Sequence, residues 1–349
     1  MEQQRLQADL LDWYDRHGRT LPWRVKNGLG DPYRVWLSEI MLQQTTVATV
    51  GPYFENFTHR WPTLEALAKA DLDSILHAWQ GLGYYARARN LHKCAGVVAR
   101  DYGGRFPDDE KELLKLPGIG AYTAAAIAAI AFGKRSAPVD GNIVRVISRL
   151  MKLETPLPQL RGEISEVFRP LVPGDRPGDF VQAIMDLGSN VCTPRKPLCD
   201  QCPWCEACAA YEAGVAGDLP KKAPKKAKPT RHGVVFWTQN ADGHVLLRRR
   251  TEEGLLGGMM EFPSTAWREK PWRQDEAIKE APLKANWKAL QGAVRHTFTH
   301  FHLELTVLSG RATPKQKQST IWSAPERLTD YALPSVMKKV ASHVSHGEM

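Results

Sequence analysis

The chain has 349 residues, enough for two or three domains, and its 43% hydrophobic and 24% charged residues exclude a disordered chain. The formal charge of +9 favours a polyanionic partner, because a Lys or Arg beside a phosphate releases a condensed counterion. No stretch approaches the ~20 apolar residues that span a bilayer, and the first residues, MEQQRLQADL, lack the basic and apolar segments of a secretory signal. We therefore expect a cytoplasmic protein without a membrane segment.

Residues 1 to about 212 have the pattern of helices joined by short turns. Asp31 and Pro32 suit an N-cap and a first-turn position ahead of the apolar stretch VWLSEIML. A second helix is predicted to begin near residues 107–109, where acidic side chains favour the positive end of the helix dipole, and a third covers the Ala- and Ile-rich residues 121–132. No convincing strand pattern occurs in this half, which predicts a mainly α region.

A further helix, predicted from Asn142, is amphipathic. Its apolar side chains recur at the spacing of one helical face, while Arg145 and Arg149 fall on the other face. The apolar positions are Ile143, Val146, Ile147 and Leu150. We expect the apolar face to pack in the core.

The pattern changes in the last third of the chain. Residues 218–233 (DLPKKAPKKAKPTRHG) are rich in Lys, Pro and Ala without an apolar period, which predicts an extended, solvated linker. After it, VVFW (234–237), a turn at 240–243 and HVLLRRR predict a β-hairpin. Residues 296–310 (HTFTHFHLELTVLSG) alternate strongly and predict one long strand. A separate α+β domain is therefore expected.

Five of the six cysteines crowd between residues 192 and 208, which indicates a metal site rather than a disulfide framework. Cys192, Cys199, Cys202 and Cys208 have the spacing C-x6-C-x2-C-x5-C, and four thiolates so close in one loop can hold a [4Fe–4S] cluster. A structural zinc site is the alternative, although zinc ribbons place two C-x2-C pairs far apart. Cys205 is expected to be a spare thiol, but Cys202, Cys205 and Cys208 form a second possible ligand set.

The sequence LPGIGAYTA (116–124) lies between two predicted helices. Gly118 and Gly120 permit a tight turn with bare backbone, after which the first amides of the next helix can hold a DNA phosphate. This is the helix-hairpin-helix pattern, which contacts backbone and gives no sequence specificity. A glycine-rich turn that only joins two helices is the alternative.

Two carboxylates lie in unlike settings. Glu39 sits within an apolar helix, so desolvation should raise the pKa of its carboxyl and keep it a proton donor near neutral pH. Asp140, in VDGN, precedes a predicted helix, whose N-terminus should stabilise the anion. Each residue also has an ordinary interpretation, Asp140 as a plain N-cap and Glu39 as a partly exposed residue on a packed helix.

Together these motifs resemble the endonuclease III/MutY superfamily of DNA glycosylases. LPWR (21–24), VWLSEIMLQQT (35–45), GLGYYARARNL (81–91), VDGN (139–142) and QAIMDLG (182–188) occur in the family's order with the hairpin and the cysteines. The resemblance is dense over residues 10–210, and LSEIMLQQT is typical of the adenine-excising branch. It implies a mainly α helix-hairpin-helix glycosylase fold with an iron–sulfur loop. It also implies that the partner is double-stranded DNA containing A:8-oxoguanine or A:G mispairs.

The resemblance also implies catalytic roles. Glu39 would protonate N7 of an extruded adenine, and Asp140 would stabilise the sugar cation or trap it covalently, with Asn142 and Tyr122 in support. In the glycosylase–lyases of the superfamily a nucleophilic lysine follows the second hairpin glycine by two residues, where this chain has Tyr122. No Schiff base is expected without that amine, so the resemblance implies a monofunctional hydrolase.

The resemblance also implies further contacts with the DNA. Gln44 would intercalate beside the lesion, or Tyr84 would wedge into the stack. Thr45, Leu82 and Tyr84 would form a wall around 8-oxoguanine. The adenine pocket would contain Trp23, Arg24, Leu42 and Gln182. Gln43 and Tyr85 are as readily explained by packing, and Arg195 and Lys196 would contribute a basic surface on the cluster loop.

The C-terminal domain resembles the Nudix-related recognition module of the same branch. GLLGGMMEFP (254–263) and RHTFTHFHLEL (295–305) carry the resemblance, while the acidic helix of a catalytic Nudix hydrolase is missing, which argues against pyrophosphatase activity. The family's Phe-Ser-His becomes Phe298-Thr299-His300, so Thr299 and His300 would contact the oxidised base. Zinc binding by His296, His300 and His302 on one strand face is the alternative.

We therefore predict a catalytic region at 1–213, with a six-helix subdomain at about 25–137 and an iron–sulfur subdomain at 1–24 and 138–213. A basic linker at 214–231 and a Nudix-like 8-oxoguanine recognition domain at 232–345 follow. The protein is expected to be monomeric, and nucleoid-associated if bacterial. The alternative functions are a thymine or uracil mismatch glycosylase of the same superfamily and a non-catalytic DNA-binding member.

Overall fold

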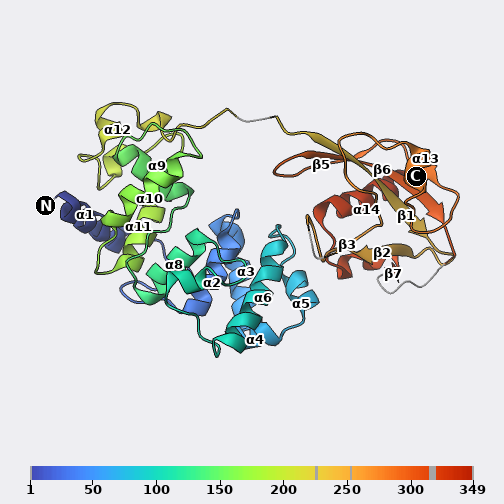
Figure 1. The fold of residues 1–349 in the computed structure, drawn as a ribbon, viewed down its shortest axis with the longest axis horizontal. Helices are drawn as coiled ribbons and strands as arrows, with labels where there is room; N and C mark the ends of the chain where they lie inside the picture. Colours follow the sequence, from blue (N-terminus) through green and yellow to red (C-terminus); the bar gives the residue numbers. More distant parts are fainter. Residues whose placement is uncertain (1, 225–226, 252–253, 314–319, 348–349) are drawn as a thin grey trace. The chain divides into compact units, whose positions relative to one another are not determined.

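The computed structural model describes residues 2–224, 227–251, 254–313 and 320–347, which form two compact units (Figure 1). Unit 1 comprises Met1–Leu72 and Arg87–Pro224, and unit 2 comprises Asp73–Ala86 and Lys225–Met349. None of the described helices is long and apolar enough to cross a membrane.

Residues 73–86, which the sequence assigns to the catalytic region, cluster with the C-terminal unit instead. Both carboxylate oxygens of Asp73 accept hydrogen bonds of 2.8 Å from the Arg249 guanidinium, and the Gln80 amide donates to the Tyr331 carbonyl at 3.2 Å. Polar contacts with residues far away in the sequence thus place residues 73–86 in unit 2. The order of the chain does not reveal these contacts.

Unit 1 is helical, as predicted. Apart from the isolated bridge between Leu157 and Lys222, its described residues form no strand. Its helices, together with α5, which lies almost wholly in unit 2, are α1 (Glu2–His17), α2 (Pro32–Leu42), α3 (Val47–Arg60), α4 (Leu64–Lys69), α5 (Leu72–Ala78), α6 (Ala86–Asp101), α7 (Glu110–Leu113), α8 (Ala121–Phe132), α9 (Gly141–Leu150), α10 (Leu160–Leu171), α11 (Pro177–Asn190) and α12 (Ala209–Glu212). Short 3-10 turns lie at Cys199–Gln201 and Ala216–Asp218.

Helix starts follow the signals in the sequence. The Asp31 side chain accepts hydrogen bonds from the amides of Tyr33 and Arg34, which satisfies donors at the N-terminus of α2. Asp109 caps α7 in the same way, and α8 covers the predicted residues 121–132.

Helix α8 is the buried centre of unit 1, packed against α2 and α11. Small alanine side chains let α11 approach closely: a Cβ at Gly178 would lie 2.9 Å from the Ala129 carbonyl oxygen, so this position needs glycine. Helices α2, α8 and α11 thereby bring residues distant in sequence around one cavity.

Two sequence expectations need correction in this unit. Arg149, opposite the apolar face of α9, is only 1% exposed, because its guanidinium donates to the carbonyls of Thr193 and Leu219. The beginning of the expected linker is also fixed rather than solvated, since the Leu157 amide donates to the Lys221 carbonyl at 3.0 Å. At its other end, residues 230–233 belong to a strand.

The described residues of unit 2 form a seven-stranded mixed sheet in the order β3-β2-β1-β6-β4, with β5 beside β6 and β7 beside β2. Among the described strands, only β1 and β6 pair in parallel, from Thr230↔His302 to Gln239↔Arg311. The elements are β1 (Thr230–Gln239), β2 (Val245–Arg249), β3 (Met260–Glu261), α13 (Gln274–Ile278), β4 (Lys288–Ala289), β5 (Val294–Thr297), β6 (His302–Arg311), β7 (Thr320–Ser323), the 3-10 helix Pro325–Asp330 and α14 (Ser335–Gly347).

Both faces of the central strand β1 are covered. Val235 and Trp237 join a core that includes α14, whereas Val234 and Phe236 join a smaller core that includes Ala277 of α13. Burial on both faces explains why VVFW is apolar without alternation. The predicted hairpin of β1 and β2 is present, with Gln239 opposite Val245.

The single strand predicted for residues 296–310 is wrong. The chain reverses between β5 and β6, where the Phe298 amide donates to the Phe301 carbonyl at 2.9 Å, and the two strands pair in antiparallel. Alternation continues through this turn, so the sequence conceals it. His300 therefore lies in the turn, and not on one strand face with His296 and His302.

Candidate active site

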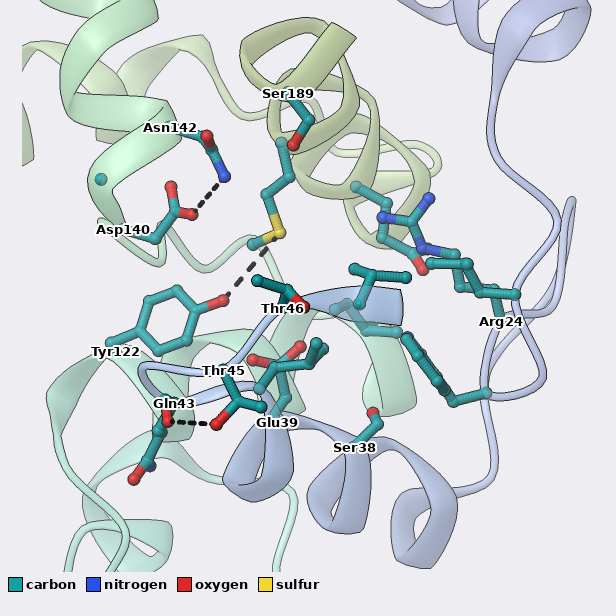
Figure 2. A pocket seen from close by; sticks show the side chains of 18 of the residues that line it. Arg24, Ser38, Glu39, Gln43, Thr45, Thr46, Tyr122, Asp140, Asn142 and Ser189 are labelled. Carbon is teal, nitrogen blue, oxygen red and sulfur yellow. Dashed lines mark hydrogen bonds between the residues drawn. The ribbon is translucent and has the colours of Figure 1, made fainter. Parts of the chain in front are cut away.

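A cavity of about 830 Å³ opens between α2, α8, α9 and α11 of unit 1 (Figure 2). It gathers every residue of this unit that the sequence assigned to catalysis, the adenine pocket or the lesion-facing loop of α2. These residues are Trp23, Arg24, Glu39, Leu42, Gln44, Thr45, Tyr122, Asp140, Asn142 and Gln182. The cavity is large enough for an extruded nucleoside.

Glu39 points from α2 towards the part of the pocket where Tyr122 and Asp140 lie (Figure 2). It is 7% exposed, and burial raises the pKa of its carboxyl to about 7. The Tyr122 hydroxyl opposes this shift, the Asp140 charge reinforces it and the Arg24 charge opposes it. The raised pKa expected from the apolar helix is therefore present, and the carboxyl can hold a proton at neutral pH.

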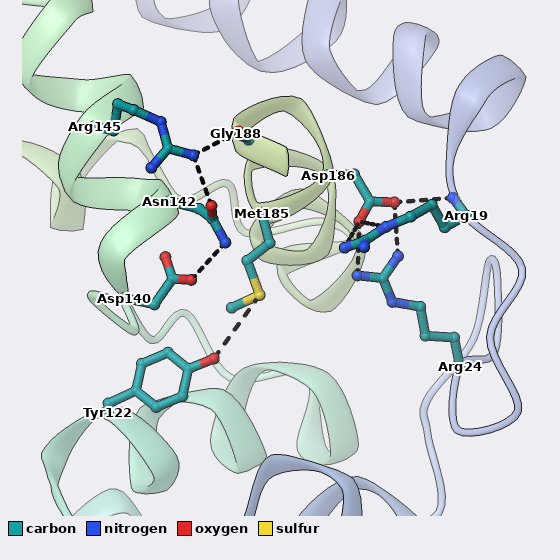
Figure 3. Close-up of polar contacts among 9 residues, drawn as sticks. All are labelled: Arg19, Arg24, Tyr122, Asp140, Asn142, Arg145, Met185, Asp186 and Gly188. Carbon is teal, nitrogen blue, oxygen red and sulfur yellow. Dashed lines mark hydrogen bonds and ion pairs between the residues drawn. The ribbon is translucent and has the colours of Figure 1, made fainter. Parts of the chain in front are cut away.

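Asp140 caps α9 and accepts a hydrogen bond from the Ile143 amide at 2.7 Å and one from the Asn142 side chain at 2.9 Å (Figure 3). The Asn142 oxygen in turn accepts from Arg145 at 2.8 Å. Burial nevertheless raises the pKa of Asp140, against the lowering effect of these donors. The sequence predicted that the helix N-terminus stabilises the Asp140 anion. The Ile143 amide acts in that direction, but burial outweighs it, and the sequence gives no measure of burial.

Tyr122 occupies the first turn of α8, and its hydroxyl donates to the Met185 sulfur at 3.9 Å (Figure 3). Burial and the nearby Glu39 and Asp140 carboxylates raise the pKa of the phenol well above its usual value. The side chain is a neutral hydrogen-bonding group between the two carboxylates.

Asp186 was missed as a site residue, although it lies in the QAIMDLG motif. Its fully buried carboxylate accepts from both Arg24 guanidinium nitrogens at 2.7 and 2.9 Å and from the Arg19 backbone amide and Nε (Figure 3). These donors hold the pKa of Asp186 below its usual range despite burial. Asp186 therefore fixes Arg24, whose charge faces Glu39. Its partners are more than 160 residues away in the chain, which hides the pairing from sequence reasoning.

The other residues assigned to the adenine pocket also line the cavity: Trp23 and Gln182 are buried, and Leu42 is partly exposed. Trp23 packs edge-on against Phe54 with ring centroids 5.3 Å apart, and Leu42 is the last residue of α2. Gln182 is 4% exposed and donates to the Gly178 carbonyl at 3.2 Å, which orients its amide within α11.

The loop after α2 presents Gln44, which is exposed and has φ = +56°. Side chains rarely adopt this left-handed conformation, so surrounding contacts must hold it. Arg87, another residue that sequence reasoning missed, donates to the carbonyls of Ile40, Met41 and Gln43 at 3.0, 2.8 and 2.6 Å, and to the Thr45 hydroxyl at 3.2 Å. A buried guanidinium thus caps α2 and fixes both ends of the Gln44 turn.

The hairpin glycines lie outside this cavity, between α7 and α8. Gly118 has φ = +77°, and a Cβ there would lie 2.7 Å from Cβ of Asn90, so glycine is required. Gly120 is the N-cap of α8; it has open space around it, and no side chain caps the helix. The first amides of α8 are therefore available to a phosphate.

The residues expected to face 8-oxoguanine fall in both units. Gln44 and Thr45 belong to unit 1, whereas Leu82, Tyr84, Thr299 and His300 belong to unit 2. Within unit 2 the Tyr84 and Thr299 hydroxyls are hydrogen-bonded at 3.0 Å, and Tyr84 is 49% exposed with φ = +46°. Leu82 is buried, and His300 is exposed beside Thr299.

Cys192, Cys199, Cys202, Cys205 and Cys208 line one small, apolar-walled cavity against α9, and all of them are free thiols. Arg149 donates to the Cys192 sulfur at 3.2 Å, and such donors stabilise thiolate ligands. Thiols that line one cavity, an apolar wall and a buried cation fit a [4Fe–4S] cluster, whose four thiolate ligands make it anionic. All five cysteines line this cavity, so its lining does not identify which four are the cluster ligands.

Comparison with known proteins defines the class of this site. The HhH-GPD superfamily of base excision DNA repair proteins matches residues 37–170, the iron–sulfur binding domain of endonuclease III matches residues 192–208, and the NUDIX domain matches residues 234–343. The chain is therefore a helix-hairpin-helix DNA glycosylase with a 4Fe–4S binding domain and a C-terminal Nudix domain, which confirms the predicted fold class and cofactor.

Full-length relatives define the family within this class. The chain is 34% identical to the adenine DNA glycosylase of Homo sapiens, over 95% of this chain and 72% of the human protein. It is 36% identical to that of Buchnera aphidicola subsp. Baizongia pistaciae, over 96% and 95% of the two chains. A thermostable thymine-DNA glycosylase matches at a TM-score of 0.55 and 34% identity, over 60% of this chain and 97% of the other. The chain belongs to the adenine DNA glycosylase family.

Proposed function

We propose that this protein excises adenine mispaired with 8-oxoguanine, or with guanine, by hydrolysis of the N-glycosidic bond. The observation that carries the proposal is the pair of carboxyls, the buried Glu39 and the partly buried Asp140, in one nucleoside-sized cavity. Glu39 protonates N7 of the extruded base, which makes the base a better leaving group. Asp140 balances the charge that develops on the sugar. This division of labour between two carboxyls follows the logic of glycoside hydrolysis.

Arg24, held by Asp186, and Tyr122 set the electrostatics of this pair. Asn142 donates to the Asp140 carboxylate and so favours its anionic form. Trp23, Leu42 and Gln182 form the walls that receive adenine, and extrusion of the base is assisted by Gln44 or Tyr84. The hairpin glycines Gly118 and Gly120 expose amides that bind the DNA backbone.

The reaction is monofunctional. Tyr122 stands where a lyase needs a nucleophilic amine, and a neutral phenol cannot form an imine with the sugar. The abasic product is therefore expected to leave with its strand intact.

Unit 2 supplies recognition of the oxidised base. Tyr84 and Thr299 share a hydrogen bond, and with Leu82 and His300 they are the residues of this unit that contact 8-oxoguanine. Thr45 is the contact assigned to unit 1. Cys192, Cys199, Cys202 and Cys208 bind the cluster, and Cys205 is spare. This cysteine loop would hold the cluster, and Arg149 of α9 contacts it through the Cys192 sulfur. Arg195 and Lys196 of the same loop supply positive charge near DNA.

The test is single-turnover base release from duplexes carrying A:8-oxoguanine, A:G, T:G and U:G. Release of adenine from the first two and not of the pyrimidines from the others supports the proposal. Preferential release of thymine or uracil would identify the pyrimidine mismatch function of the matched thymine-DNA glycosylase instead. Tight binding without base release from any duplex would identify a non-catalytic DNA-binding protein.

A further inference from the structure

A second groove, of about 730 Å³, lies beside the active-site cavity in unit 1. Its walls come from the N-terminal half of α9, from residues near the start of α10 and from residues 217–222. Four of its lining side chains are cations, Arg145, Arg161, Lys221 and Lys222. Asp218 is the only acid among the described residues that line the groove. No lining residue is aromatic, so the groove offers charge and no surface on which a base could stack.

The wall formed by residues 217–222 is held in place by the helical unit. Leu157 pairs in parallel with Lys222, and its amide donates to the Lys221 carbonyl at 3.0 Å. The Lys221 ammonium contacts the Glu154 carboxylate at 2.6 Å, and Arg149 donates to the Leu219 carbonyl at 3.0 Å. These contacts present the two lysines at a fixed edge of the groove.

The groove adjoins the active-site cavity, because Gly141 and Arg161 line both. Arg161 donates to the Val139 carbonyl at 3.3 Å, one residue before Asp140. Gly141 presents bare backbone here, since no atom lies within 4 Å of a Cβ built at this residue. If a nucleotide enters the active site, the adjoining phosphates of its strand would lie near Gly141 and Arg161.

We propose that this groove binds the phosphodiester backbone of the strand that carries the extruded adenine, and that Lys222 and Arg161 contact its phosphates. The inference rests on the proposed base extrusion for the identity of the strand. It assigns a DNA contact to Lys222, which precedes the C-terminal domain and which composition alone assigns to a linker. Because the contact is electrostatic, the groove binds without regard to sequence.

The first experiment measures the salt dependence of binding to an undamaged duplex, by fluorescence anisotropy. Lys222→Gln removes one charge and keeps both the backbone pairing and the Lys221–Glu154 contact. It should weaken binding and reduce the slope of log K against log salt by about 1. Lys69→Gln, at the end of α4, removes one exposed lysine outside the groove and should leave the slope unchanged. Equal slopes for the two variants would overturn the proposal.

The second experiment locates the phosphate. Neutral methylphosphonates are placed one at a time on each strand around the mispair. The wild type should lose affinity at a position on the adenine strand beside the target nucleotide, and Lys222→Gln should lose no further affinity at that position. Additive losses at every position, or a loss confined to the 8-oxoguanine strand, would refute the assignment. Undamaged-duplex binding needs no base excision, so a failed adenine assay would refute the proposed function without affecting this result.

Discussion

The Arg87 guanidinium donates to the Gln43 carbonyl at 2.6 Å, directly before the left-handed turn at Gln44. Arg87→Met removes four hydrogen bonds from this loop and should reduce adenine extrusion by about tenfold or more, since hydrogen bonds from a charged donor contribute ~1.5–3 kcal/mol each. Fluorescence of 2-aminopurine at the adenine position measures extrusion. Arg100→Met, on the exposed end of the same helix, is the control and should extrude normally. A normal signal from Arg87→Met would show that the turn does not need this residue.

Glu39→Gln should bind the mispair almost normally and lose ~10²–10⁴-fold in base excision, because an amide cannot donate the proton. In the wild type the required form is protonated. With the pKa of Glu39 raised to about 7, excision is therefore fast below pH 7 and declines as the pH rises through that value. Single-turnover rates between pH 5.5 and 9 test this. A rate that stays flat to pH 9 would exclude Glu39 as the general acid.

Asp140→Asn separates the structural role of this residue from its charge. Asparagine is an equally good N-cap, so α9 and the melting temperature should be retained. Excision should fall ~10²–10³-fold, because the amide cannot balance the sugar cation. In the wild type the Asp140 anion is lost as the pH falls, and excision slows with it. Because the pKa of Asp140 is raised, this loss of rate begins at a higher pH than for an ordinary carboxyl. Retained activity in a folded Asp140→Asn protein would leave Asp140 as a cap only.

The purified protein should be brown and contain about four irons per chain. Cys199→Ser should lose the colour or fail to fold, whereas Cys205→Ser should keep both colour and iron. Absorption spectra with iron and sulfide analysis decide between the ligand sets. Stoichiometric zinc without sulfide, after anaerobic purification, would contradict the cluster.

Borohydride should trap little covalent protein–DNA product, since Tyr122 offers no amine. Abasic sites should persist until heat or alkali cleaves the strand. Tyr122→Lys places an amine in the first turn of α8 and should introduce trapping at the active site. Efficient trapping by the unmodified protein, at the rate of base release, would show that another amine acts as the nucleophile.

The sequence predicted the parts of the site that depend on local pattern. The apolar neighbours of Glu39 predicted its raised pKa, and the glycines of LPGIG predicted the turn that Gly118 makes at φ = +77°. The caps at Asp31 and Asp140 also follow from neighbouring residues. Local rules suffice for these features because the residues that predict them lie within one or two helical turns.

The misses involve contacts between distant segments. Arg149 has the position of a surface residue on α9, yet its hydrogen-bond acceptors come from the cysteine loop and from Leu219. Asp186 has no unusual neighbours in sequence, and its importance comes from Arg19 and Arg24. The Lys- and Pro-rich segment is held by Leu157, which no compositional signal indicates. The burial and the partners of these residues therefore depend on tertiary contacts, which the local sequence pattern does not show.

The Arg24–Asp186 pair joins residues 162 positions apart in the chain. At a synthesis rate of ~5–20 residues per second, Asp186 leaves the ribosome on the order of 10–30 s after Arg24. The loop between α1 and α2, which carries Arg24, cannot contact α11 before that time. A nascent chain therefore carries its general acid, Glu39, for many seconds before it has the enclosure in which that acid can work.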